Sequence, residues 1–154
     1  MAEFEFIRPE DKPALLAMCN EEWLASVQAV VSELGYKSLT AESSADFLTR
    51  FASIQFQLVI IDELFCAATP ADNTALHSLQ TMPMGFRRHA TVILIGDSFQ
   101  TMHPLQAYQQ SVHAVVNRAD AATLAQIIQP VIADNGLFLH TYRDTQRRIA
   151  EGKA

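Results

Sequence analysis

The sequence predicts an α/β protein built on a doubly wound, five-stranded parallel sheet. Apolar runs of strand length alternate with segments of helical period, and this alternation repeats five times. The runs are continuously apolar, which indicates strands that crossover helices bury on both faces. The 154 residues contain no internal repeat and no linker, so we expect one domain at 13–135, an N-terminal arm at 1–12 and a C-terminal tail at 136–154.

The first helices have recognisable ends. We expect the strands at 13–19, 37–41, 57–62, 90–96 and 112–116, and the helices that follow them at 21–35, 43–54, 70–80, 101–110 and 120–132. Glu21 and Glu22 begin the first helix, where the helix dipole favours acids, and Gly35 ends it. Ser43 or Ser44 caps the second helix. The strand at 37–41 is the weakest of the five.

The later helices are marked by prolines and by an apolar stripe. Pro70 and the polar residues after it open the third helix, and Pro104 lies in the first turn of the fourth. The fifth carries apolar residues on one stripe, namely Leu124, Ile127, Ile128, Val131 and Ile132. Pro130 removes an internal hydrogen bond, so we expect a kink or break there.

The tail beyond Gly136 predicts an extra C-terminal helix. Its expected inward residues are Phe138, Tyr142 and Ile149, and its expected outward residues are Arg143, Arg147 and Arg148. Such apolar residues must be covered by the chain's own sheet, by a second copy or by a partner. We expect a homodimer to which the last two helical segments contribute contacts.

Composition excludes several classes of function. The formal charge is −6, which argues against nucleic-acid binding, and no apolar run approaches the roughly 18 residues of a membrane span. The acidic start is unlike a leader peptide, so we expect a cytoplasmic protein. Cys19 and Cys66 are expected to be buried thiols rather than a disulfide. The cluster at 87–89 is expected to be a solvated loop.

The run FQLVIIDELF at 56–65 ends a buried strand on a carboxylate, Asp62. A desolvated charge costs several kcal/mol without partners, so Asp62 is expected where the strand emerges into a cleft. In open α/β sheets, ligands bind in the cleft at the carboxyl ends of the strands. If Asp62 is only hydrogen-bonded, Asp62→Asn should change stability by about 1 kcal/mol, whereas a larger loss would indicate a buried charged network.

Three stretches together resemble the receiver domains of two-component response regulators, which have a flavodoxin-like (βα)5 fold. They are AVVSELGY at 29–36, FQLVIIDELF at 56–65 and VVNRADAATLAQII at 115–128, and the resemblance covers 13–133. The stretch at 82–102 is also similar to small, bacterial, atypical receivers. In receivers, the aspartate that ends the third strand is phosphorylated, which makes Asp62 the phosphoacceptor candidate.

The resemblance also implies that the receiver's magnesium site is altered. The acidic pair that binds magnesium in receivers is matched by Met18 and Cys19, and neither offers the hard oxygen that this ion prefers. A slip in the alignment would let Glu21 or Glu22 replace the pair, but their expected role is to begin the first helix. We therefore expect no metal site.

Other receiver positions are changed as well. Gly96 stands where receivers carry a threonine or serine that contacts the phosphoryl group, and Asn117 and Arg118 replace a lysine and proline. Ala114 replaces the aromatic residue that couples phosphorylation to the opposite face. Asp62 is then expected to accept backbone hydrogen bonds or to pair with a cation such as Arg118.

These positions favour a non-enzymatic, atypical receiver-like module of bacterial signalling that binds a protein partner or a second copy, without a cofactor. One alternative is a phosphorelay receiver that is phosphorylated on Asp62. A second is a small-ligand sensor that uses the reshaped cleft around Met18, Gly96 and Asn117. Nucleotide-binding glycine loops and nucleophile elbows are absent from the sequence, and its histidines have no metal-ligand spacing; among them His113 merits inspection.

Overall fold

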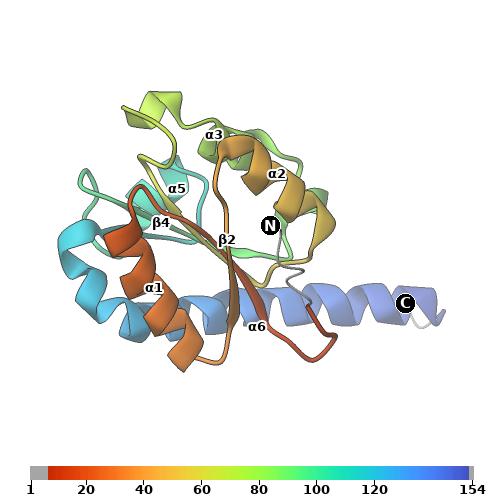
Figure 1. Ribbon diagram of the computed structural model, residues 1–154. Helices are drawn as coiled ribbons and strands as arrows, with labels where there is room; N and C mark the ends of the chain where they lie inside the picture. The colour runs from red at the N-terminus through yellow and green to blue at the C-terminus, as the bar shows by residue number, and fades with distance from the viewer. Residues whose placement is uncertain (1–6, 153–154) are drawn as a thin grey trace.

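The computed structural model describes residues 7–152, which form a five-stranded parallel sheet in the order β2-β1-β3-β4-β5 (Figure 1). The strands are β1 (Pro13–Ala17), β2 (Lys37–Thr40), β3 (Leu58–Asp62), β4 (Thr91–Gly96) and β5 (Ala114–Asn117). All neighbouring pairs are parallel. This order is the doubly wound, flavodoxin-like arrangement, so the predicted fold class is confirmed.

Helices cover both faces of the sheet. One face is covered by α1 (Glu21–Glu33) and α6 (Leu124–Ala150), and the other by α2 (Ser44–Ser53), α3 (Thr74–Thr81) and α5 (Pro104–Gln109). In Figure 1, α1 and α6 lie together on the side of the sheet opposite α2 and α3.

Each inner strand contributes side chains to both hydrophobic layers. Leu15 and Val59 pack with Phe47 of α2, whereas their neighbours Leu16 and Ile60 pack with the helices on the opposite face. All four strand residues are fully buried. Successive side chains of a strand point to opposite faces, so a strand covered on both sides must be apolar at every position.

The helix starts follow the expected capping chemistry, with one correction. The Asn20 side chain accepts a hydrogen bond from the backbone of Trp23 at the start of α1, and Ser43 does the same for α2.

The single third helix predicted at 70–80 is wrong. A short 3-10 helix, η1 (Pro70–Asp72), is separated from α3 by Asn73, whose side chain caps α3.

A short helix, α4 (Met84–Arg87), lies where the sequence suggested a solvated loop. That prediction is wrong for Arg87, which is buried. Its guanidinium donates hydrogen bonds to the carbonyl oxygens of Leu79, at 2.8 Å, and Ser111, at 2.7 Å. The arginine therefore joins the end of α3 to the turn before β5, and a buried cation of this kind cannot be distinguished from a solvated one by composition.

The C-terminal helix is one continuous element. After the 3-10 helix η2 (Arg118–Thr123), α6 runs without a break through Pro130 and Gly136. Of the expected kink or break, the break is therefore absent, and the expected start of the tail lies inside the helix. Ile127 and Ile128, before Pro130, and Val131, directly after it, pack against the core. Tertiary packing of this kind supplies most of a helix's stability and outweighs the missing hydrogen bond.

The predicted inward face of the tail is wrong by part of a turn. Phe138 is 71% exposed and Ile149 is also exposed, whereas Leu139 is buried. Asn135, one turn earlier, donates a hydrogen bond to Thr91 Oγ1 at 2.8 Å. Tyr142 is half-buried beneath the guanidinium of Arg88.

The two cysteines and the possible membrane spans were also subjects of prediction. Cys19 and Cys66 are free thiols, as expected, but both are exposed, so their predicted burial is wrong. Among the helices at 7–152, none is both long and apolar enough to cross a membrane.

Candidate functional site

The carboxyl ends of β1, β3, β4 and β5 meet at one edge of the sheet, and Asp62 lies there, fully buried. Arg118, directly after β5, donates to both carboxylate oxygens. Its Nη2 lies 2.9 Å from Oδ1, and its Nη1 bonds Oδ2. The backbone N–H of Leu64 also donates to Oδ1, at 2.9 Å. Both predicted kinds of partner, a backbone donor and Arg118, are therefore present.

The Arg118 guanidinium is held from several directions. Its Nε donates to Asp97 Oδ1 at 3.2 Å, and its Nη1 lies 3.5 Å from Cys19 Sγ. The Trp23 ring centroid lies 5.6 Å from its Cζ, a cation–π distance. The hydrogen bonds to Asp62 raise the pKa of Arg118 further above its already high value, so the cation is permanent.

The two positions matched to the magnesium-binding pair have different surroundings. Met18 packs into the core on the α1 side of the sheet. Cys19 is partly buried beside Asp62, and both the burial and the carboxylate raise the pKa of its thiol. Glu21 and Glu22 are exposed in the first turn of α1. Within residues 7–152, no three His, Cys, Asp or Glu side chains gather as metal ligands would.

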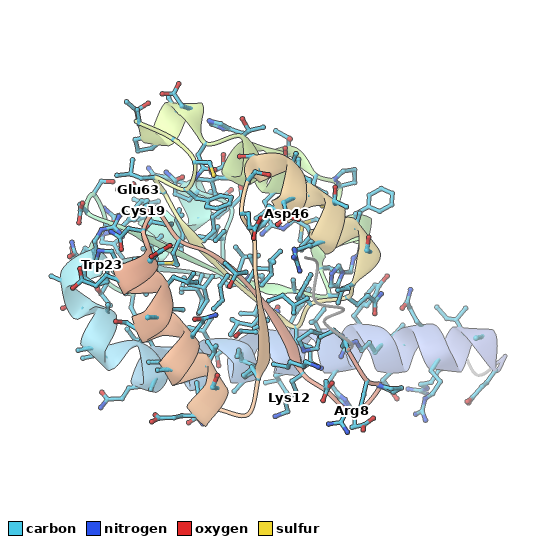
Figure 2. The ribbon with its side chains drawn as sticks, in the orientation of Figure 1. Arg8, Lys12, Cys19, Trp23, Asp46 and Glu63 are labelled. Carbon is cyan, nitrogen blue, oxygen red and sulfur yellow. The ribbon has the colours of Figure 1, made fainter. Side chains whose placement is uncertain are left out.

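Glu63 is a site residue that sequence reasoning missed. It is 4% exposed, and its carboxylate accepts hydrogen bonds from the backbone N–H of Asp97, at 2.9 Å, and from Ser98 Oγ, at 2.6 Å. Its side chain lies over Gly96, where an added Cβ would come within 2.3 Å of Glu63 Cδ. Glycine at position 96 is therefore required by the carboxylate that crosses it. Figure 2 labels Glu63 and Cys19, which follow the carboxyl ends of β3 and β1.

Asn73 fixes the loop that follows Asp62. This buried amide donates to the carbonyl oxygens of Asp62, at 2.9 Å, and Glu63, at 3.0 Å, while its own oxygen accepts from the backbone of Leu76. It thus satisfies two backbone groups at the end of β3 and caps α3 with the same side chain. The only signal for it in the sequence was an ordinary helix cap.

Asn117 and Ala114 have structural surroundings. The Asn117 amide donates to the carbonyl oxygen of Phe99, at 2.8 Å, and its oxygen accepts from the backbone of Ala119, at 2.9 Å. Its backbone N–H donates to Thr101 Oγ1. Ala114 is buried in the sheet. The side chain at 117 therefore supports the loop after β4, and the cation at Asp62 comes from the next residue.

The cleft suggested around Met18, Gly96 and Asn117 is filled by the chain's own side chains. Met18 lies in the core, Glu63 covers Gly96, and the amide of Asn117 is engaged with backbone groups. The edge of the sheet therefore presents charged groups that pair with one another in place of that cleft.

His113 lies at the opposite end of the sheet. Its Nδ1 accepts a hydrogen bond from the backbone N–H of Val92, at 2.9 Å, which requires an unprotonated nitrogen. Burial, with a smaller contribution from Arg87, lowers the pKa of His113. The neutral ring therefore has a structural partner in β4.

Comparisons with known proteins point to one fold. No protein-family model matches the sequence, and no match to a curated protein was found. The structure is similar to a provisionally assigned pilus assembly-related protein of Burkholderia pseudomallei, with 18% identity, a TM-score of 0.59, and coverage of 84% of this chain and 95% of that one. It is also similar to a CheY-like response regulator receiver domain of Methanospirillum hungatei, with 14% identity, a TM-score of 0.63, and coverage of 82% and 98%.

A third similar structure is NtrX of Brucella abortus, solved with ADP. The TM-score is 0.68 at 14% identity, and the match covers 91% of this chain but only 30% of that protein. At these identities the likeness shows the receiver fold alone.

Proposed function

We propose that this chain is a receiver-fold signalling module that acts through a protein–protein contact and whose Asp62 is not phosphorylated. The fold shared with receiver domains supports a signalling role. The observation that carries the proposal is the buried ion pair, in which Arg118 engages both oxygens of Asp62. A carboxylate in this state is neither exposed to a phosphodonor nor free to attack one.

The surrounding charges also disfavour phosphoryl transfer. The reaction depends on metal ions and fixed donors that stabilise charge on the transferring group, and loss of one well-placed donor costs about 10²-fold or more. Here Met18 and Cys19 stand at the metal-ligand positions, and the negative carboxylate of Glu63 lies over Gly96. That carboxylate would repel an arriving phosphoryl group.

We expect no phosphorylation of the purified chain when it is incubated with magnesium and acetyl phosphate. The reason is that Asp62 remains paired with Arg118. Intact mass spectrometry should show no gain of one phosphoryl group, while a receiver with an intact acidic pair, treated in parallel, shows that the donor is active. A gain in the wild type that disappears in Asp62→Asn would support the phosphorelay alternative and overturn the proposal.

The surface best suited to a protein contact lies on α4 and α6. Met84, Leu137 and Phe138 are large, apolar and exposed. Met84 and Phe138 line a cavity of about 330 Å³ between the two helices. We call Met84, Leu137 and Phe138 the α4–α6 surface. Exposed apolar side chains that gather, as Met84 and Phe138 do at this cavity, usually mark an interface, because their exposure to water is unfavourable.

We expect the full chain to form a homodimer through the α4–α6 surface, because a closed two-fold dimer is the commonest way for one chain to bury such a patch. Sedimentation equilibrium at micromolar concentrations should show the dimer. Phe138→Ser should weaken it about tenfold or more, because a large apolar contact is lost. The control, His140→Ser, changes an exposed residue of the same helix. A wild type that stays monomeric would exclude self-association and leave a different protein as the partner.

A further inference from the structure

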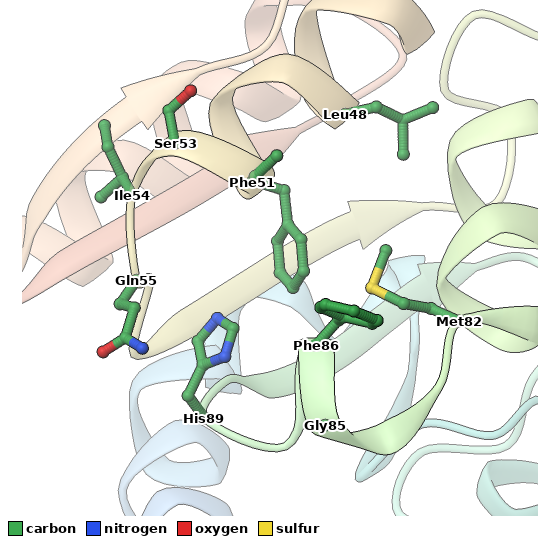
Figure 3. A pocket seen from close by; sticks show the side chains of 10 residues that line it. Leu48, Phe51, Ser53, Ile54, Gln55, Met82, Gly85, Phe86 and His89 are labelled. Carbon is green, nitrogen blue, oxygen red and sulfur yellow. The ribbon is translucent and has the colours of Figure 1, made fainter.

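A cavity other than the one between α4 and α6 lies at the opposite end of the sheet from Asp62. This cavity of about 500 Å³ opens between the end of α2, the loop before β3 and helix α4. Figure 3 shows Phe51, Met82 and Phe86 on one side of it, with His89 and Gln55 on the other. Its volume falls in the range of roughly 300–1,000 Å³ that small-molecule sites occupy, and its apolar lining is typical of them.

Two smaller hollows adjoin the cavity. One is about 270 Å³ and the other about 240 Å³, and both share Gln55 and His89 with the larger cavity. Both are also lined by Arg143 of α6. We call the three hollows together the basal cleft. It therefore has an aromatic end at Phe51 and Phe86 and a cationic end at Arg143.

His89 stands between the two ends with a polar atom that lacks a partner. Its ring stacks on Phe51 at a centroid distance of 5.3 Å. Its Nε2 is shut off from water and makes no hydrogen bond with any part of the chain that the structure describes. Burial, with a smaller contribution from Arg143, lowers the pKa of His89, so the ring is neutral. A buried polar group left unpaired is costly, so the chain itself leaves this wall of the cavity incompletely satisfied.

The cationic end also has unused capacity. Across residues 7–152, the exposed Arg143 forms no ion pair and no hydrogen bond, although it lies close enough to His89 to affect its charge. Neighbouring Arg88 donates its Nε to the Met84 carbonyl and lies 4.5 Å from the Tyr142 ring centroid, which leaves its other donors available. Guanidinium groups bind carboxylates through paired hydrogen bonds.

We propose that the basal cleft binds a small molecule with an aromatic or alkyl body and a terminal carboxylate. The body packs between Phe51 and Phe86 and against the His89 ring, and the carboxylate meets Arg143. Charge complementarity selects an acid over its neutral amide. The basal cleft does not include Asp62, so ligand binding there does not depend on whether Asp62 is phosphorylated.

Calorimetric titration with 3-phenylpropanoate and octanoate, each against its neutral amide, tests the proposal. The wild type should bind at least one acid saturably at millimolar concentrations or below, and more tightly than its amide. Arg143→Gln should weaken acid binding about tenfold, the effect of losing one charged hydrogen bond, and leave amide binding unchanged. Arg148→Gln, an exposed charge on the same helix outside the cleft, should have no effect.

A second variant places a large side chain in the wall of the cavity. Gly85 lines it, and a Cβ built there meets nothing within 4 Å, so Gly85→Leu should fold normally and abolish acid binding. Unchanged acid binding in this variant would overturn the assignment to the basal cleft. Failure of both acids to bind the wild type, or equal binding of acid and amide, would also overturn the proposal. If Gly85→Leu alters the oligomeric state while neither acid binds, the cleft accommodates another protein chain and the proposal is wrong.

Discussion

Arg118→Met is expected to destabilise the fold by about 3–5 kcal/mol, because it leaves the carboxylate of Asp62 buried without its cation. Asp62 is 0% exposed, so water cannot replace the guanidinium without opening the structure. Asp62→Asn should be costly for the corresponding reason, since Arg118 would then face a neutral amide. Of the two outcomes predicted from the sequence for Asp62→Asn, a change of about 1 kcal/mol or a larger loss, the buried ion pair favours the larger loss.

A double-mutant cycle separates the ion pair from the packing. Replacing both partners, as Asp62→Leu with Arg118→Met, should recover most of the loss, because neither charge then remains unpaired. Urea unfolding of the wild type, each single variant and the double variant gives the coupling energy. Arg148→Met, an exposed control, should change stability by less than about 0.5 kcal/mol. Additive losses in the double variant would show that the two residues do not act as a pair.

Gly96→Ala is expected to cost about 2–3 kcal/mol, although it adds a single methyl group. The added Cβ would lie 2.3 Å from Glu63 Cδ, so the side chain of Glu63 must move and give up its hydrogen bonds to Asp97 and Ser98. Thermal and urea unfolding measure the loss. Gly85→Ala is the matched control, because nothing lies within 4 Å of its added Cβ, and it should be neutral or stabilising.

The same substitution in a Glu63→Ala background tests the cause. With the carboxylate removed, Gly96→Ala should cost less than about 0.5 kcal/mol. A cost that stays the same with and without Glu63 would mean that the strain comes from elsewhere in β4, and the account of Gly96 given above would be wrong.

The sheet could be predicted from the sequence because burial on both faces forces every residue of an inner strand to be apolar. Asp62 stood out for the same reason, as a charge at the end of such a run. The role of Glu63 could not be predicted, since it depends on the path of its side chain across Gly96 at the end of β4. Arg118 could be named as a candidate partner, but only the geometry shows that its guanidinium takes both oxygens of Asp62.

Helical phase was the weakest part of the prediction. The buried positions of the second half of α6 continue the spacing of Val131, Asn135 and Leu139, four residues apart. Asn135 is polar, so its inward position was hidden from a reading that counts only apolar residues. Phe138, which is apolar but exposed, was predicted to face inward in its place. A buried asparagine that bonds Thr91 is a tertiary contact, and helical periodicity does not report it.

The uninterrupted α6 is longer than the sheet that it covers. At 1.5 Å per residue its 27 residues span about 40 Å, and Figure 1 shows its far end projecting beyond the sheet. Its root follows η2, which begins at Arg118. The buried residues of α6 extend from Leu124 to Leu139, so packing fixes the helix that far, and only the 11 residues after Leu139, about 16 Å of helix, project. This projecting end lies away from Asp62, past the end of the sheet where Asn135 bonds Thr91, and it offers a neighbouring molecule helix surface that no strand covers.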